Sequence, residues 1–152
     1  MNRPPTRAWV YAGVLAALIV ALDQVAKAII EDRLVPGEDV DVVGPVGLTL
    51  SHNKGVAFGL AGGGGVLLLA FTLGALALIV YLFAREPRRP GMWVAVGLLA
   101  GGAIGNLTDR IRAGAVTDFI AVGSWPPFNV ADVAITLGVA VLAWSYLRET
   151  ET

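Results

Sequence analysis

Four long apolar runs constrain this chain more than any other feature of its sequence. They cover residues 8–28, 66–84, 91–111 and 130–147. Each is close to the roughly 20 residues that an α-helix needs to cross the hydrocarbon core of a membrane. Only 15% of the 152 residues are charged, whereas soluble domains carry about 25%. The sequence therefore predicts an all-α membrane protein with four transmembrane helices, folded as a single domain over residues 1–152.

The first run must be distinguished from a secretory signal peptide, because Arg3 and Arg7 precede it. It is longer than the apolar core of a typical signal peptide, and no A-x-A cleavage site follows it. Asp23 and Lys27 also lie near its end. We therefore expect this run to be a membrane span.

The distribution of arginine predicts the orientation in the membrane. An even number of spans places both chain ends on the same side, together with the short loop 85–90 (R-E-P-R-R-P), which holds three arginines. Because Lys and Arg are enriched in cytoplasmic loops, we expect both termini in the cytoplasm. Aromatic residues, which concentrate at membrane interfaces, fall at these same ends of the spans: Trp9, Tyr11, Tyr81, Trp93, Trp144 and Tyr146.

Two segments would then lie on the outer side, residues 29–65 and 112–129. Within the first, the stretch 39–50 (D-V-D-V-V-G-P-V-G-L-T-L) is rich in valine and is broken by a Gly-Pro pair. This pattern predicts a small β-sheet in the first outer loop. The glycine-rich stretch 61–65 (A-G-G-G-G) predicts a flexible joint before the second span.

Polar residues gather near the outer ends of three of the four predicted spans. They are Asp23 and Lys27 in the first span, Asn106, Asp109 and Arg110 in the third, and Asn129 and Asp132 in the fourth. Spacings of three or four residues place each set on one helix face. An intramembrane charge costs about 2.5–3.5 kcal/mol at a helix centre and usually has a function. We therefore expect these residues to share a site near the outer surface.

A ridge of small residues runs along the third span, with Gly97, Gly101 and Gly105 spaced by four residues. Such a ridge lets a neighbouring helix backbone approach closely. We expect it to bring the polar face of the third span against another helix.

The residue types narrow the chemistry that this site could perform. The chain has no cysteine, one histidine (His52), and neither an HExxH nor a GxSxG motif, which makes a zinc site unfavourable. A net charge of −1 argues against a nucleic-acid partner. Two aspartates that share a site ionise one after the other, so one can hold a proton while the other activates water. Aspartic-type peptide hydrolysis is therefore possible.

Two other functions stay open from the residues alone. Membrane carboxylates often mark an ion path, although the inner halves of all four runs are nearly free of charge, which favours a site open on one side. A non-catalytic scaffold would not need two aspartates and two asparagines at one depth.

Five short motifs occur in order along the chain and resemble those of the bacterial lipoprotein signal peptidase, also called signal peptidase II. They are L-D-Q-V-A-K (22–27), H-N-K-G-V-A-F-G (52–59), G-N-L-T-D-R (105–110), V-T-D-F (116–119) and F-N-V-A-D (128–132). The resemblance covers nearly the whole chain, from the first predicted span to the fourth.

The resemblance implies an aspartic endopeptidase of the bacterial inner membrane that needs no metal or organic cofactor. Such an enzyme cleaves prolipoproteins just before a diacylglyceryl-modified cysteine, at the outer face of the membrane. The motif aspartates Asp118 and Asp132 would form the catalytic dyad. The other motif residues would line or brace the site: Asp23, Lys27, Asn53, Asn106, Asp109, Arg110 and Asn129. We expect a monomer whose partners are its prolipoprotein substrates and membrane lipid, with a mobile outer segment that clamps the substrate.

Overall fold

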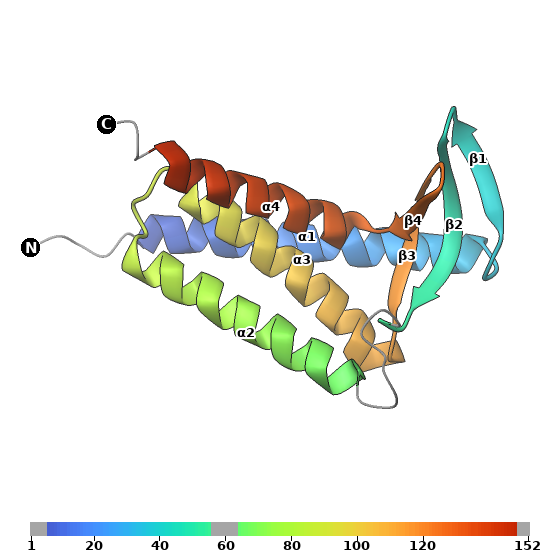
Figure 1. Ribbon diagram of the computed structural model, residues 1–152, viewed down its shortest axis with the longest axis horizontal. Coiled ribbons are helices and arrows are strands. Elements are labelled where there is room, and N and C mark those ends of the chain that lie inside the picture. Colours follow the sequence, from blue (N-terminus) through green and yellow to red (C-terminus); the bar gives the residue numbers. More distant parts are fainter. Residues whose placement is uncertain (1–5, 56–63, 149–152) are drawn as a thin grey trace, which may run out of the picture.

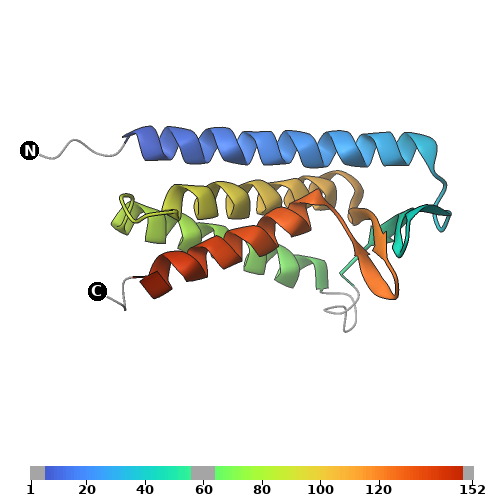
Figure 2. The ribbon, with the colours of Figure 1, turned by 90° about the horizontal axis from the view of Figure 1, so that it is seen from above.

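Over the residues that the structure describes, the fold is a bundle of four helices with an antiparallel sheet at one end (Figure 1). The computed structural model describes residues 6–55 and 64–148. The helices are α1 (Thr6–Arg33), α2 (Gly64–Arg85), α3 (Met92–Ala113) and α4 (Val130–Leu147). The strands are β1 (Asp39–Val43), β2 (Val46–Asn53), β3 (Val116–Val122) and β4 (Trp125–Phe128). Helix α1 begins and α4 ends at the end of the bundle opposite the sheet (Figures 1 and 2).

Each of the four predicted apolar runs forms a helix, apart from Gly91, which directly precedes α3, and α4 has the predicted bounds. Helix α2 begins at Gly64 rather than at residue 66; the expected joint lies partly at 61–63, outside the described residues. The first predicted run, 8–28, lies inside α1, and the helix continues beyond it to Arg33. Its last turns are held by the side chain of Ile30, which packs in a small core with Leu50 and Phe119 of the sheet.

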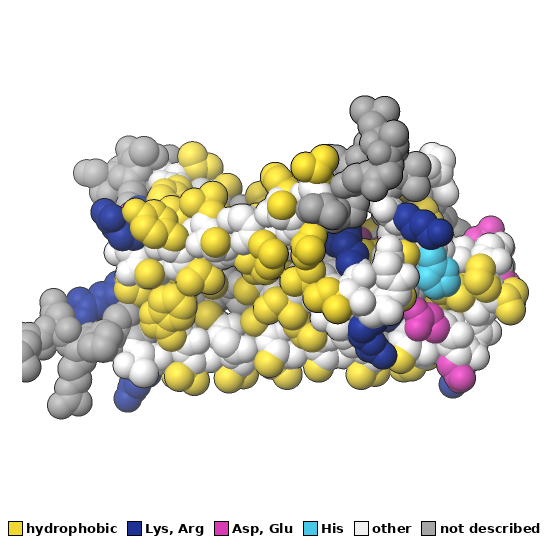
Figure 3. Space-filling model, turned by 90° about the horizontal axis from the view of Figure 1, so that it is seen from below, with side chains coloured by type: hydrophobic (Ala, Val, Ile, Leu, Met, Phe, Trp, Pro, Cys, Tyr) yellow, Lys and Arg dark blue, Asp and Glu magenta, His cyan; other side chains and the backbone are white. Residues whose placement is uncertain are grey.

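Two of the described helices, α1 and α4, are clearly long and apolar enough to cross a membrane. A shorter apolar stretch occupies Leu69–Arg85 of α2. Apolar side chains cover the helical part of the face seen in Figure 3, whereas the acidic side chains on that face lie at the sheet end. The helical surface is therefore apolar where a soluble bundle would be polar.

Helix α3 packs between α1 and α4 through its glycines. A Cβ atom on Gly97 would lie 2.9 Å from the side chain of Leu15 of α1. On the other side of α3, a Cβ atom on Gly102 would lie 2.5 Å from the carbonyl oxygen of Ala131 of α4. Real Cβ atoms do not approach other atoms this closely, so only glycine permits these contacts. The predicted approach of a helix to the glycine ridge is confirmed.

The sheet has the strand order β1-β2-β3-β4 and is antiparallel throughout. Confining the sheet to the first outer loop was wrong, because β3 and β4 come from the connection between α3 and α4. In the register of β2 with β3, Ser51 lies opposite Asp118 and His52 opposite Thr117. The sheet thereby fixes an aspartate that sequence reasoning placed on a loop.

Candidate active site

The start of α4 is a capping box that fixes Asp132. The Asn129 side-chain oxygen accepts a 2.9 Å hydrogen bond from the backbone N–H of Asp132. In return, Asp132 Oδ2 accepts a 3.2 Å hydrogen bond from the backbone N–H of Asn129. This reciprocal pair satisfies donors that a helix start otherwise leaves free. One oxygen of Asp132 is thus used for capping, while the other faces the site.

Strand β3 carries the second aspartate, Asp118, which is buried. Asn129 Nδ2 donates a 2.7 Å hydrogen bond to Asp118 Oδ1. A side-chain hydrogen bond from Asn53, at the end of β2, reaches the same carboxyl group. Asp118 is therefore held from the sheet on one side and from the start of α4 on the other.

Asn106 of α3 completes the link between the two aspartates. Its Nδ2 donates a 2.8 Å hydrogen bond to Asp132 Oδ1. Its Oδ1 accepts a 3.1 Å hydrogen bond from Asn129 Nδ2. Because an amide offers both donors and an acceptor, Asn106 and Asn129 together connect one carboxyl group to the other.

The two aspartates also interact through their charges. The pKa of Asp118 is raised to about 6, chiefly by burial and also by the nearby negative charge of Asp132. The hydrogen bonds from Asn53 and Asn129 and the positive charge of Lys27 act in the opposite direction. A carboxyl group with such a raised pKa binds a proton more readily than an ordinary aspartate.

A cluster of buried charges, Asp23, Lys27 and Asp109, lies next to this pair. Lys27 Nζ lies 2.7 Å from Asp23 Oδ2 and 2.6 Å from Asp109 Oδ2. Lys27 also donates a 3.2 Å hydrogen bond to Asn106 Oδ1, which connects the cluster to the aspartate pair. Asp23 Oδ1 accepts a 2.9 Å hydrogen bond from the backbone N–H of Ala131. The cluster therefore joins α1, α3 and α4 at the depth of the site.

Arg110 is half-buried, and the charges of Asp132, Asp118 and Asp109 act on its guanidinium group. Asn53 is exposed, and its side-chain oxygen accepts a 2.9 Å hydrogen bond from the backbone N–H of Gly55. The structure thus brings together, at the sheet end of the bundle, every residue that the sequence assigned to the site.

Three polar residues at the site were missed by sequence reasoning: Gln24, Glu31 and Thr117. Gln24 Nε2 donates a 2.8 Å hydrogen bond to Asp109 Oδ1. Thr117 Oγ1 donates a 2.6 Å hydrogen bond to Glu31 Oε1. Gln24 and Thr117 stand inside quoted motifs, and Glu31 follows Lys27 by four residues, so helix spacing alone could have indicated it.

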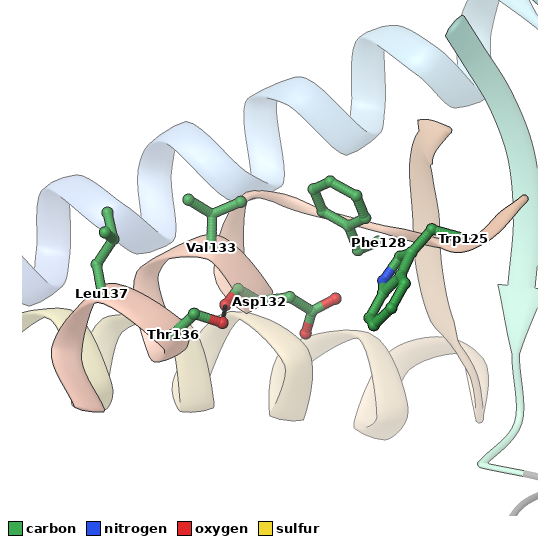
Figure 4. Close-up of a pocket in the computed structure, with 6 residues that line it drawn as sticks. All are labelled: Trp125, Phe128, Asp132, Val133, Thr136 and Leu137. Atoms are coloured by element: carbon green, nitrogen blue, oxygen red, sulfur yellow. Dashed lines mark hydrogen bonds between the residues drawn. The ribbon is translucent and has the colours of Figure 1, made fainter. Parts of the chain in front are cut away.

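An open, mostly apolar groove of about 320 Å³ begins at Asp132. Its lining residues come from β4 and the first turns of α4: Trp125, Phe128, Asp132, Val133, Thr136 and Leu137. Figure 4 shows the Asp132 carboxyl group pointing toward Trp125 and away from Val133 and Leu137 of the same helix. The site therefore combines a carboxylate with a surface suited to an apolar chain.

Within residues 6–55 and 64–148, no three His, Asp or Glu side chains are grouped so that they could hold a metal ion. The polar groups that converge here are carboxyl, amide, ammonium and guanidinium groups. They can bind and transfer protons at a polar centre beside an apolar groove.

Comparison with known proteins agrees with this geometry. The lipoprotein signal peptidase of Pelotomaculum thermopropionicum is 39% identical over 140 residues, covering 91% of this chain and 92% of that protein. The lipoprotein signal peptidase of Moorella thermoacetica is 41% identical over 138 residues, covering 88% of this chain and 91% of that protein. A solved bacterial membrane enzyme superposes with a TM-score of 0.84 at 33% identity, over 90% of this chain and 92% of the other.

The model of one protein family matches most of the chain. Its description is "Signal peptidase (SPase) II", and the match runs over residues 15–148, from within α1 to the end of α4. This range contains both aspartates, both bridging asparagines and the buried charge cluster. The chain belongs to the signal peptidase II family of aspartic peptidases.

Proposed function

We propose that this protein is an aspartic endopeptidase that removes the signal peptide from diacylglyceryl-modified prolipoproteins, cleaving just before the lipidated cysteine. The observation that carries the proposal is the pair Asp118 and Asp132, joined by two shared amides at the head of an apolar groove. Membership of the signal peptidase II family supports the same reaction. Prolipoproteins are the substrates that the names of the similar proteins imply.

The two aspartates would divide the acid and base roles. Asp118, whose pKa is raised to about 6, would carry the shared proton at rest, while Asp132 would be ionised. Asp132 lines the groove and, as a carboxylate, would take a proton from a water molecule that attacks the scissile carbonyl carbon. When the C–N bond breaks, Asp118 would give its proton to the leaving amine. The shared proton then remains on Asp132 and returns to Asp118 before the next cycle.

The groove would hold the apolar part of the substrate beside the scissile bond. Signal peptides have apolar cores, and a diacylglyceryl group is apolar along its chains. Trp125 is 71% exposed at the mouth of the groove, where it could contact such a chain. The asparagines, Arg110 and the buried charge cluster would brace the dyad.

We propose further that all four helices span the bacterial cytoplasmic membrane, with the sheet on the outer side and both termini in the cytoplasm. A stripe of exposed apolar side chains along α1 supports this placement: Val10, Val14, Leu18, Leu22, Val25 and Ile29. The arginine-rich loop between α2 and α3 lies at the end of the bundle opposite the sheet (Figure 1), as the preference of basic loops for the cytoplasm requires. The enzyme would work as a monomer within this lipid.

A gel-shift cleavage assay tests the proposal. Purified protein in detergent is incubated with a diacylglyceryl-modified prolipoprotein, alongside Asp118→Asn and Asp132→Asn variants whose folding is verified by thermal unfolding. Cleavage by the wild type that is lost in both folded variants supports the aspartic mechanism. Cleavage that survives in either variant refutes the dyad assignment. If the folded wild type does not cleave, the peptidase function is refuted for this substrate. An ion path or a non-catalytic scaffold would then again be the functions to test.

A further inference from the structure

Helix α1 carries one more polar residue, Glu31, on the face that serves the site. Asp23, Lys27 and Glu31 follow one another at intervals of four residues, and such residues lie above one another on an α-helix. The first two belong to the buried charge cluster. Glu31 lies on the last turns of α1, which extend beside the sheet (Figure 1), and its Oε1 accepts a 2.6 Å hydrogen bond from Thr117 Oγ1.

Thr117 is buried, with 3% of its surface exposed. Its N–H, carbonyl and hydroxyl groups each form a hydrogen bond with a different segment: α3, the residue that caps α4, and α1. Its backbone N–H donates to Asp109 Oδ2 at 3.2 Å. Its carbonyl oxygen accepts a hydrogen bond from Asn129 Nδ2 at 3.3 Å. Its hydroxyl group donates to Glu31. Since the next residue of β3 is Asp118, fixing Thr117 also fixes the backbone from which Asp118 projects.

The pairing with β2 alone does not fully fix the backbone of β3 at Thr117 and Asp118. The pairing of β2 with β3 is irregular between Leu48 and Ser51, opposite Ile120 and Asp118. Such irregularities interrupt the ladder of hydrogen bonds and commonly occur beside active sites. Successive side chains of a strand point to opposite faces, so an anchor on the Thr117 side leaves the Asp118 side free for chemistry.

We propose that Glu31 is a positioning residue for Asp118, acting through the hydroxyl group of Thr117. The inference rests on the proposed role of Asp118 in catalysis. Among the described residues, Glu31 binds Thr117 and is not part of the lining of the groove at Asp132. It holds strand β3 to α1, so that Asp118 keeps its distance and direction relative to Asp132.

The surroundings of Glu31 allow this role to be separated from packing. Glu31 and Thr117 line an open polar cavity of about 250 Å³ between α1 and α3. Water can therefore occupy the space of a truncated Glu31 side chain. A shortened side chain should then release β3 without opening a void in the core.

The test measures kcat and KM for cleavage of a diacylglyceryl-modified prolipoprotein by Glu31→Ala and Thr117→Val. Each is expected to lower kcat about tenfold with KM unchanged. The free energy of one hydrogen bond to a charged group corresponds to about a tenfold change in rate. Glu31→Gln and Thr117→Ser keep an acceptor and a hydroxyl group, and are expected to stay within about twofold of wild type. The double variant Glu31→Ala with Thr117→Val is expected to have the same kcat as either single variant, because both substitutions remove the same hydrogen bond.

The matched control is Asp32→Ala. Asp32 is an exposed carboxylate of the same turn, displaced by about 100° around the helix, and its removal is expected to leave kcat unchanged. Full activity of Glu31→Ala, or a double variant whose losses multiply, would overturn the proposal. So would a kcat loss matched by an equal loss in Asp32→Ala. If Glu31→Ala does not fold, the comparison of Thr117→Val with Thr117→Ser decides the question.

Failure of this inference can be told apart from failure of the proposed function. If Asp118→Asn is inactive and Glu31→Ala is fully active, only the positioning role is refuted. If Asp118→Asn retains cleavage, the dyad itself is refuted.

Discussion

Asn129 donates a 2.7 Å hydrogen bond to Asp118 while its side-chain oxygen caps the helix that carries the other aspartate of the site. Asn129 is fully buried, with no exposed surface. Asn129, which caps α4, therefore also holds β3 and its Asp118 at a fixed distance from α4 and its Asp132. Local helix chemistry and the geometry of the site depend here on one side chain.

Replacing Asn129 should separate these two duties. Asn129→Ala removes both the cap and the amide donor, whereas Asn129→Ser keeps a capping oxygen. Both variants are expected to lower kcat by about ten- to a hundredfold, because the hydrogen bond to the Asp118 carboxyl group is lost. Only the alanine variant should lose a further ~1 kcal/mol of stability, measured by thermal unfolding in detergent. A serine variant with wild-type kcat would contradict the role of the amide.

The raised pKa of Asp118 predicts how stability depends on pH. The pKa is about 6 in the folded protein and 3.8 for an ordinary aspartate. Between these values the folded state binds more protons than the unfolded state, so stability falls as pH rises from about 4 to about 6. Asp118→Asn removes this contribution. Melting temperatures of both proteins over this range check it: the wild type should lose more stability than the variant, and parallel curves would contradict the prediction.

Helix positions were predictable from the sequence because each depends on a local run of residues. The bounds of α4 follow from an apolar run that begins directly after Asn129. The glycine ridge of α3 likewise predicted close packing, since spacing alone puts those glycines on one face. The clustering of polar residues at one depth followed from the order and direction of the spans.

What could not be predicted depends on contacts between distant segments. The apolar run ends at residue 28, whereas α1 continues to Arg33, where Ile30 packs on Leu50 and Phe119 of the sheet. Strand β3 was read as a connection because its partner, β2, lies more than sixty residues earlier in the chain. The four-residue spacing from Lys27 could have indicated Glu31, but its partner Thr117, 86 residues away, could not be predicted.

The contact between Gly102 and α4 predicts an intolerant position. A Cβ atom there would meet the carbonyl oxygen of Ala131 at 2.5 Å, so Gly102→Ala must push the start of α4 away. We expect a loss of about 1–3 kcal/mol in stability. We also expect a lower kcat, because Asp132 directly follows the displaced Ala131. Gly74→Ala on α2 is the control, since no atom of the described residues lies within 4 Å of its Cβ position. Equal stability of the two variants would argue against this packing.

Lys27 is expected to stabilise the fold by neutralising two buried carboxylates. Lys27→Met would leave Asp23 and Asp109 without their shared cation, at a cost of about 3–5 kcal/mol. Adding Asp23→Asn should recover part of this loss, because one unpaired charge is then removed. Denaturant unfolding of the single and double variants measures both effects. Lys54→Met, at an exposed lysine, should change stability by no more than about 0.5 kcal/mol.

The groove beside Asp132 makes a prediction about substrate binding rather than chemistry. Leu137 lines the groove and is 53% exposed, so Leu137→Trp would fill part of the groove without moving the dyad. We expect KM for a diacylglyceryl-modified prolipoprotein to rise about tenfold or more, a loss of about 1.4 kcal/mol in binding, with a smaller change in kcat. Val139 is 54% exposed on the same helix and does not line the groove. Val139→Trp should therefore leave KM unchanged. A similar KM for both variants would mean that the apolar part of the substrate binds elsewhere on the protein.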